Sequence, residues 1–388
     1  MKVLVAIPCL LEGGTEVQTL SLVEALSEAG HHVGVVCYFE WSGKMAEAFR
    51  KSGAEVTLLS PDGKRPTGIV ATTRFLWKGL GETVRSFRPD VVHVQYMAPG
   101  ALPTLILRLR GVKQILATLH TGADIFSPRG LKIIRFLTSR ILTGMQCISL
   151  TAEKSFFGKA VLFENNSSGQ SPSSFLPKHF TIYNAVPSHI SPLTGTRTRL
   201  DNSPLTVGVV SRLEPIKGMD LVVPAFIKAR SADIDLRLIV AGAGSLRKEM
   251  ERQVAEAGVE EYVEFAGLIE SVELERIYDR IDVLLVPSRS EGFGLTLIEG
   301  MTRGCVPVAA NVGGLPEVMG PVLAPLLHAP ESVDDIAARI MLLARDRNLL
   351  AYYSAAALSR AIEFAPHKYR QAVQQLYRLL ETNDGNMS

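Results

Sequence analysis

Residues 282–301 read DVLLVPSRSEGFGLTLIEGM, and the stretch changes character at its centre. The apolar run at its start predicts a buried strand, Gly292 and Gly294 predict a tight turn, and the apolar residues after them recur at helical spacing. A buried strand that turns into a helix is the repeating unit of a doubly wound α/β sheet with helices on both faces. The first amides of such a helix have no partner within it, so they can bind phosphate oxygens at the turn.

The same strand–helix alternation occupies most of the 388 residues. It runs over residues 1–190, where 164–178 form a loop rich in Ser, Asn, Gly and Pro, and it begins again at 204 after a second loose stretch at 187–204. One hydrophobic core rarely grows beyond ~250–300 residues, which also favours two domains. We therefore expect an α/β fold of two Rossmann-like doubly wound domains, 1–190 and 204–365, that face a cleft. Ligands of such sheets bind at the carboxyl ends of the strands.

Composition narrows the class of protein. Residues 1–200 hold 22 Lys and Arg against 13 Asp and Glu, whereas the rest hold 19 against 26. This asymmetry indicates either an anionic partner for the N-terminal half or only a different surface composition. The four cysteines lack CxxC spacing and no apolar run approaches ~18 residues, which favours a cytoplasmic protein with reduced thiols and no membrane span. Basic residues do not interleave with aromatic residues, so nucleic-acid binding is disfavoured.

Two cations follow a second predicted strand. Arg212 and Lys217 come directly after the apolar run LTVGVV, residues 205–210. A planar guanidinium and a compact ammonium at the end of a strand suit a diphosphate. Taken alone, the pair could equally be two solvated surface charges.

Two carboxylates bracket the glycine turn of the opening stretch. Glu291 precedes the turn and Glu299 lies within the predicted helix. A carboxylate beside a phosphate site repels phosphate, so we expect each to accept hydrogen bonds from neutral hydroxyls. Hydroxyls at both ends and phosphate in the middle describe a nucleotide-diphosphate sugar.

The first domain offers a weaker signal. Gly13 and Gly14 follow the first predicted strand, and His120 ends the apolar run QILATLH. These residues could contact a ligand through backbone amides and an imidazole, or form a simple tight turn and a structural histidine. Asp233 and Asp235 spell the D-x-D pattern of some metal-dependent sugar-nucleotide enzymes, but they precede a predicted strand, at the end away from the expected ligand, so we interpret them as a solvated turn.

Together these elements resemble the GT-B retaining glycosyltransferases of family 4, also called glycosyl transferases group 1. The resemblance covers the whole chain and is sharpest over 204–320, where SRLEPIKG, VAGAGSLRKEM, VEFAGLI and DVLLVPSRSEGFGLTLIEGMTRGCVPVAANVGGLPEV stand. The early GGTEVQTLSLVEAL is also similar to that family. Departures from its pattern are Ser211 and Gly300, and IYNAVP is a loose version of another family element, which makes Asn184 only a candidate.

The resemblance implies a role for each candidate residue. Arg212 and Lys217 would neutralise the donor diphosphate, Glu291 would contact the donor sugar and Glu299 the ribose. The remaining donor-binding candidates would lie along the sugar, phosphates or base, or face the site from the first domain: Gly13, Gly14, His120, Leu268, Phe293, Gly294 and Leu295. The catalytic group would comprise Glu291, Lys217, Arg212 and His120, with no metal and no cofactor. The terminal segment, 366–388, would return to the first domain.

The implied activity is the retaining transfer of a hexosyl-type sugar from a UDP- or GDP-sugar to a glycan or lipid-linked acceptor. A sugar-nucleotide 2-epimerase of the same fold and a non-enzymatic sugar-binding protein are the alternatives. Residues 127–142 mix basic and apolar side chains, which predicts either contact with an anionic membrane, at its inner face, or an ordinary core helix with a basic outer face.

Overall fold

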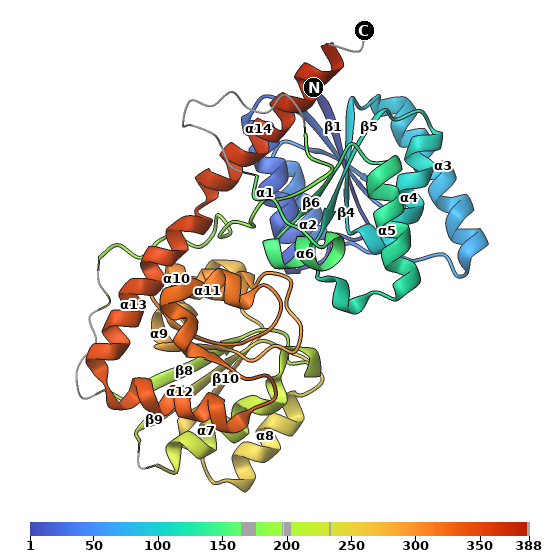
Figure 1. Cartoon of the computed structure of the whole chain (residues 1–388). Helices are drawn as coiled ribbons and strands as arrows, with labels where there is room; N and C mark the ends of the chain where they lie inside the picture. Colours follow the sequence, from blue (N-terminus) through green and yellow to red (C-terminus); the bar gives the residue numbers. More distant parts are fainter. Residues whose placement is uncertain (164–175, 196, 198–202, 233, 386–388) are drawn as a thin grey trace, which may run out of the picture. The chain divides into compact units, whose positions relative to one another are not determined.

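The computed structural model describes residues 1–163, 176–195, 197, 203–232 and 234–385. It divides into two compact units, Met1–Ala185 with Pro366–Ser388, and Val186–Ala365. Each unit is a parallel sheet with helices on both faces (Figure 1). This is the doubly wound α/β architecture that the strand–helix alternation predicts. Most of the predicted loop at 164–178, and Asp233 of the D-x-D pattern, lie outside the described residues.

The first unit has a seven-stranded sheet of order β3-β2-β1-β4-β5-β6-β7. Its central strands β1, β4 and β5 are buried on both faces, which explains why they appear in the sequence as continuous apolar runs. The strands are β1 (Lys2–Ile7), β2 (His32–Cys37), β3 (Glu55–Leu58), β4 (Val91–Gln95), β5 (Gln114–Leu119), β6 (Gly144–Cys147) and β7 (His179–Thr181). The helices are α1 (Gly14–Glu28), α2 (Gly43–Lys51), α3 (Ile69–Phe87), α4 (Met97–Leu109), α5 (Pro128–Arg140), α6 (Leu150–Phe157) and α14 (Pro366–Gly385).

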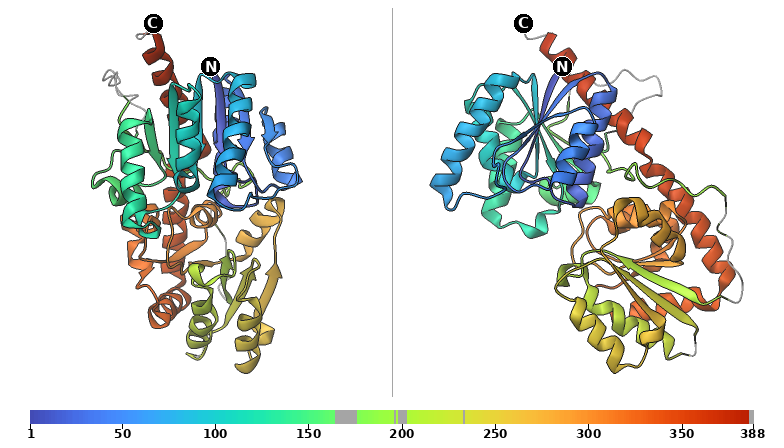
Figure 2. Two further views of the ribbon diagram at one scale, coloured as in Figure 1. Left: turned by 90° about the vertical axis from the view of Figure 1, so that its right-hand side faces the viewer. Right: turned by 180° about the vertical axis from the view of Figure 1, so that it is seen from behind.

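Helices form two layers around this sheet (Figure 2). One face is covered by α1, α2 and α14, and the other by α3, α4 and α5. Helix α14, which the resemblance assigns to the first domain, buries Leu376, Tyr377 and Leu380 in the first of these cores. Tyr377 also bonds through its hydroxyl to Nδ1 of the buried His93 on β4, at 2.9 Å.

The second unit has a six-stranded sheet of order β10-β9-β8-β11-β12-β13. The chain builds outward from β8 to β10 on one side and from β11 to β13 on the other, so the order reverses between β8 and β11. The strands are β8 (Leu205–Val210), β9 (Leu236–Ala241), β10 (Val263–Gly267), β11 (Val283–Val286), β12 (Val306–Ala310) and β13 (Leu327–His328). The helices are α7 (Val222–Arg230), α8 (Arg247–Glu256), α9 (Leu274–Arg280), α10 (Leu295–Thr302), α11 (Leu315–Leu323), α12 (Val333–Arg345) and α13 (Arg347–Ala361).

Among the described residues, no helix is both long enough and apolar enough to cross a membrane. Within the described residues no disulfide joins the four cysteines, and all but Cys9 are buried.

Candidate functional site

The reversal of strand order in the second sheet identifies where a ligand would bind. Strands β8 and β11 are hydrogen-bonded neighbours, with Val207 opposite Val283. The loops that follow them therefore leave the same edge of the sheet side by side, at the topological switch point that open α/β sheets use for ligands. One loop carries Arg212 and Lys217, and the other carries Glu291.

Lys217 and Glu291 are in direct contact. Nζ of Lys217 donates to Oε2 of Glu291 at 2.6 Å, and the two side chains are only 21% and 18% exposed. Ser288 also donates to the same carboxylate oxygen, at 3.3 Å. The sequence predicted separate partners for these residues, phosphate for the lysine and hydroxyls for the glutamate, whereas the structure brings them together. An ammonium has three protons, so two donors of Lys217 stay available to an incoming anion.

Arg212 lies on the same loop but is exposed. Its loop is tied to the loop after β9 by Glu214, whose carboxylate accepts from the backbone amide and the hydroxyl of Ser245 at 2.9 and 2.6 Å. These hydrogen bonds from Ser245 lower the pKa of Glu214, and the nearby positive charge of Arg212 lowers it further. The structure therefore leaves the guanidinium of Arg212 at the surface of a loop with a fixed backbone.

Two glycines allow the loops to pack this closely. Gly313, with φ +53°, lies so near the loop after β11 that a Cβ atom would be 1.9 Å from the carbonyl oxygen of Glu291. Gly218, with φ +65°, would similarly place a Cβ atom 2.0 Å from the carbonyl oxygen of Pro287. Only glycine combines the left-handed backbone with this approach. The amide of Gly314 donates to the Glu291 carbonyl at 3.0 Å and holds the turn.

Arg289 is a residue that the sequence reasoning missed. Its guanidinium donates to both carboxylate oxygens of Asp220 at 2.7 and 2.8 Å, and its amide donates to the carbonyl of Ile216 at 2.9 Å. It also pairs with Glu331. The hydrogen bonds from Arg289 lower the pKa of Asp220. Arg289 thus fastens the loop after β11 to the loop that carries Lys217, and only the tertiary structure shows that it is not a ligand-facing cation.

The glycine turn sets the beginning of helix α10. Gly294 is the residue before the helix and has φ +102°. The first hydrogen bonds within the helix are donated by the backbone amides of Leu297 and Ile298. The amides before them have no acceptor within the helix, and they point outward at its N-terminus. The side chain of Phe293 is 2% exposed and packs edge-on against Phe364, with ring centroids 5.5 Å apart. Phe293 can therefore offer a ligand only its backbone.

Glu299 lies one turn into α10. Its Oε2 accepts from the hydroxyl of Tyr278 at 2.6 Å, and burial raises the pKa of its carboxyl. Within the described residues its other oxygen has no hydrogen-bond partner, so it can accept from a hydroxyl of a ligand. Leu268, expected near a base, follows β10 and is 81% exposed.

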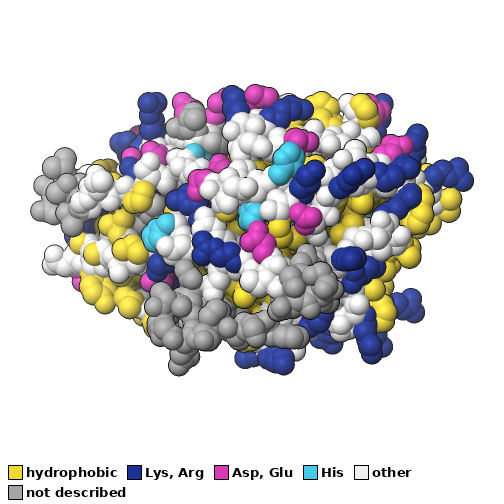
Figure 3. All heavy atoms as spheres, turned by 90° about the horizontal axis from the view of Figure 1, so that it is seen from above, with side chains coloured by type: hydrophobic (Ala, Val, Ile, Leu, Met, Phe, Trp, Pro, Cys, Tyr) yellow, Lys and Arg dark blue, Asp and Glu magenta, His cyan; other side chains and the backbone are white. Residues whose placement is uncertain are grey.

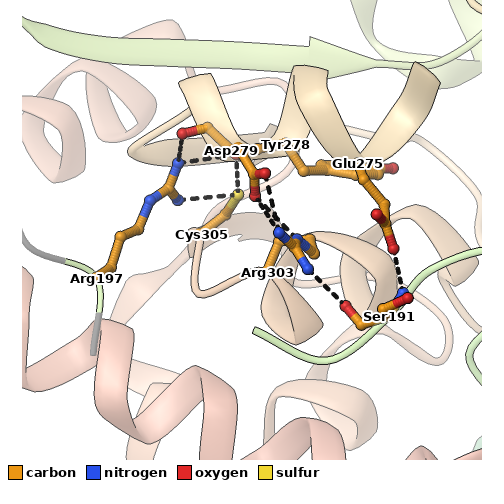
Figure 4. Close-up of polar contacts among 7 residues, drawn as sticks. All are labelled: Ser191, Arg197, Glu275, Tyr278, Asp279, Arg303 and Cys305. Atoms are coloured by element: carbon orange, nitrogen blue, oxygen red, sulfur yellow. Dashed lines mark hydrogen bonds and ion pairs between the residues drawn. The ribbon is translucent and has the colours of Figure 1, made fainter. Parts of the chain in front are cut away.

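Tyr278 is held in place by a polar network around the end of α9 (Figure 4). Arg197 donates to the carbonyl oxygen of Tyr278 at 2.9 Å and reaches Sγ of Cys305 at 3.4 Å. Arg303 forms a two-pronged ion pair with Asp279 at 2.8 and 2.9 Å. Arginines suit the carboxyl end of a helix because they satisfy its last carbonyls and its negative dipole. The network fixes the tyrosine that orients Glu299.

Glu299→Gln is expected to stabilise the unliganded protein. The raised pKa means that the fold disfavours the ionised carboxyl, so ionisation costs stability above the folded pKa and costs nothing below the unfolded one. An amide keeps the bond from Tyr278 without the buried charge. The midpoint of thermal unfolding at pH 7.5 should rise by roughly 2–4 °C, the equivalent of about 1 kcal/mol.

That gain should shrink at pH 4, and the exposed Glu270→Gln serves as the control with no expected change. An unchanged or lowered midpoint for Glu299→Gln at pH 7.5 would show that Glu299 carries no such penalty.

In the first unit, the candidates lie at another switch point, between β1 and β4. Gly13 caps α1 and Gly14 begins it. A Cβ atom on Gly13 would be 2.6 Å from Oε2 of Glu16, so the glycine leaves room for that buried carboxyl. His120 follows β5, and its Nε2 lies 2.9 Å from Oε1 of Gln95 at the end of β4. The sequence reasoning did not single out Gln95.

The D-x-D pattern lies away from these loops. Asp235 immediately precedes β9, at its amino end, and pairs with Arg230 at 3.7 Å. Asp233 is outside the described residues. The part of the chain that the structure describes contains no group of three or more His, Cys, Asp or Glu side chains that could hold a metal ion.

Two family models and several known proteins match this chain. Residues 196–360 match the family model for glycosyl transferases group 1, and residues 13–154 match the model for a glycosyl transferase 4-like domain. The chain is 28% identical over 352 residues to a GDP-mannose-dependent alpha-(1-6)-phosphatidylinositol monomannoside mannosyltransferase of Mycobacterium tuberculosis, covering 86% of this chain and 87% of the relative. It is 36% identical over 131 residues to a 2-deoxystreptamine glucosyltransferase of Streptomyces kanamyceticus, about a third (34%) of each chain.

Solved structures share the fold. HepE from Anabaena, in complex with UDP and glucose, has a TM-score of 0.76 at 18% identity and covers 98% of this chain and 100% of its own. Sucrose-phosphate synthase from Thermosynechococcus elongatus has a TM-score of 0.74 at 19% identity, covering 99% and 100%. Both family models, the full-length relative and the fold lead to one conclusion: the chain belongs to the group 1 glycosyltransferases of family 4, with the GT-B fold.

Proposed function

We propose that the protein transfers a hexosyl residue from a nucleoside-diphosphate sugar to an acceptor hydroxyl, with retention of configuration and without a metal ion. The observation that carries the proposal is the arrangement at the switch point of the second sheet. A cation on the loop after β8, Lys217, meets the loop after β11, which leads straight into the N-terminus of α10.

This arrangement suits the departure of a diphosphate. Leaving-group charge collects on the distal phosphate oxygens, and fixed donors stabilise that charge without reorganising. Lys217, Arg212 and the first amides of α10 would supply those donors in place of a metal. Glu291 and Glu299 would accept hydrogen bonds from sugar and ribose hydroxyls. As the donor's phosphate arrives, Lys217 shares its remaining protons with it while Glu291 continues to hold the ammonium in position. The departing phosphate then takes the acceptor's proton.

Two nucleotides, GDP and UDP, are the candidates for the donor. The mycobacterial relative is named for GDP-mannose, and the Anabaena structure contains UDP and glucose. The first experiment is therefore a panel of UDP- and GDP-sugars, tested first for thermal stabilisation and then for turnover with EDTA present. We expect one donor to stabilise the protein, and its transfer product to keep the anomeric configuration of the donor by NMR.

The same assay separates the alternatives. A 2-epimerase would release free sugar or its epimer with no glycosylated product, and a binding protein would be stabilised without turnover. Loss of turnover with EDTA that returns on adding a divalent cation would contradict the metal-independent mechanism.

We also propose that the acceptor is presented at an anionic lipid surface that helix α5 contacts. Ile134, Leu137 and Thr138 face the core, as expected for a core helix. The opposite face, however, exposes apolar as well as basic side chains: Ile133 and Phe136 are 51% and 58% exposed. The exposed cations of α5 are Arg129, Lys132, Arg135 and Arg140, and its sequence contains no Asp or Glu.

Positive charge extends beyond this helix. Residues 69–140 contain 11 Lys and Arg against 3 Asp and Glu. In Figure 3, Lys and Arg side chains gather on the right of the view, over the side of the first unit where Figure 1 places α3, α4 and α5. Basic residues beside apolar ones are what anionic lipid attracts, at about 1 kcal/mol for each cation near the surface.

Cosedimentation with vesicles tests this part separately. The whole protein should bind vesicles that contain phosphatidylglycerol and should not bind vesicles of pure phosphatidylcholine. Lys132→Glu and Phe136→Ser should each weaken binding by ~5-fold or more. Tyr352→Ser is the control, because Tyr352 in the second unit is also 58% exposed. A protein that stays in the supernatant with both lipids would refute the lipid contact and leave the sugar-nucleotide proposal untouched.

A further inference from the structure

A buried amide without a full set of partners lies at the switch point of the first sheet. Gln95 ends β4 and is 1% exposed. Its Oε1 lies 2.9 Å from Nε2 of His120, while its Nε2 has no hydrogen-bond partner within the described part of the chain. A buried donor without a partner costs ~1–3 kcal/mol. Unpaired buried side-chain atoms occur elsewhere in the described residues, among them Oε1 of Gln114. Nε2 of Gln95 differs in its place, because Gln95 stands at the carboxyl end of β4, the edge of the sheet where ligands bind. The unpaired amide therefore points to a ligand.

The contact with Gln95 determines where His120 carries its proton. An amide oxygen can only accept a hydrogen bond, so Nε2 of the imidazole must be the donor. Burial lowers the pKa of His120 to about 3, which keeps the ring neutral. A neutral imidazole with its proton on Nε2 has an acceptor lone pair on Nδ1. His120 makes no other hydrogen bond among the described residues, so Nδ1 is available to a ligand hydroxyl.

The backbone beside Gln95 is strained. Tyr96 has φ +62° and ψ +93°, outside the regions that non-glycine residues normally adopt. Its ring centroid lies 5.2 Å from that of His120. Such strain costs of order 1–3 kcal/mol and clusters at ligand sites. Strand β1 pairs with β4, so the loop after β1 lies beside the loop that follows Gln95. That neighbouring loop carries Gly13 and Gly14.

From this geometry we propose that Gln95 is a positioning residue for sugar binding. It holds His120 with the proton on Nε2, so that Nδ1 accepts a hydrogen bond from a sugar hydroxyl, and its own Nε2 donates to an oxygen of the same sugar. The identity of the ligand as a sugar rests on the proposed function; the proton position does not. A reversed amide would turn Nε2 toward the ring, leave the proton on Nδ1 and make His120 a donor instead.

Two variants separate the two roles. Gln95→Glu keeps an acceptor for the Nε2 proton but removes the amide donor. Gln95→Met has a similar length and removes both. Gln114→Met is the matched control: Gln114 is a buried glutamine on the adjacent strand β5, but at its amino end, where it donates to the carbonyl of Leu380 at 3.3 Å.

The primary readout is long-range ¹H–¹⁵N NMR of the full chain labelled at its 8 histidines, with His120→Gln to assign the signal. We expect the Nε2-protonated form in the wild type, in Gln95→Glu and in Gln114→Met, and a mixture of both neutral forms in Gln95→Met. A proton on Nδ1 in the wild type, or unchanged signals in Gln95→Met, would overturn the positioning role. Because no ligand is present, this result is independent of whether the protein transfers sugar.

Titrations with sugars and sugar nucleotides complete the test. UDP-glucose, GDP-mannose, and free glucose or mannose are titrated against the His120 Nδ1 signal. One of them should shift it, with affinity reduced ~3–10-fold in Gln95→Glu and further in Gln95→Met. A shift with a sugar nucleotide assigns the hydroxyl to the donor, and one with free sugar assigns it to the acceptor. No shift with any probe would refute sugar binding at Nδ1 even if the proton lies on Nε2.

Discussion

Lys217→Ala is expected to lower kcat by ~10²–10³, the loss typical of removing one fixed donor from a developing anion, about 2.7–4 kcal/mol. Glu291, which precedes the turn that leads into α10, already holds the ammonium of Lys217 at 2.6 Å. The charge of Lys217 matters most when the diphosphate departs, so the KM for the acceptor should change little. Steady-state kinetics with the donor found in the panel provide the measurement.

Lys248→Ala is the control for losing a lysine from the same unit, because Lys248 is exposed on α8. Its kcat should equal that of the wild type. Lys217→Arg restores the charge with a different shape and should recover only part of the rate. If Lys217→Ala retained more than about half of the wild-type kcat, the diphosphate role of Lys217 would be wrong.

Gly313→Ala is expected to cost about 2–5 kcal/mol of stability, the sum of forcing a left-handed backbone on alanine and moving packed backbone apart. The new Cβ atom would be 1.9 Å from the carbonyl oxygen of Glu291, so the loop after β11 must shift. We expect the midpoint of thermal unfolding to fall by roughly 5–15 °C. The displaced Glu291 should also weaken stabilisation by the donor.

Gly258→Ala isolates the first of the two costs. Gly258 also lies in the second unit with a positive φ, +64°, but a Cβ atom there would meet nothing within 4 Å. It should lose only about 1–2 kcal/mol and bind donor normally. Equal losses in the two variants would mean that the close approach of Gly313 to Glu291 has no energetic consequence.

The fold could be predicted from sequence because its signals are local. Strands such as β4 and β5 are buried on both faces and therefore appear as unbroken apolar runs between amphipathic helices. The turn at Gly294 was equally visible, since a glycine between a buried strand and a helix is typical of a tight turn. Ligands of such sheets bind at the carboxyl ends of the strands, and this alone predicts Arg212, Lys217 and Glu291 as site residues, even when the strand order is unknown.

The pairing of groups across loops could not be predicted from sequence. Spacing gave no indication that Lys217 would pair with Glu291, or that Arg289, in the middle of the opening stretch, would be held by Asp220. The resemblance places Phe293 along the ligand, and the burial of its side chain leaves only its backbone for such a contact. Gln95 lies in an apolar strand, and its importance appears only when its buried Nε2 is seen to have no partner within the described residues.

A crystal structure with the nucleoside diphosphate of the preferred donor tests the central claim most directly. We predict phosphate oxygens within hydrogen-bond distance of both Nζ of Lys217 and the first amides of α10, with the ribose hydroxyls at Glu299. A diphosphate bound out of reach of both the lysine and the helix N-terminus would contradict the account.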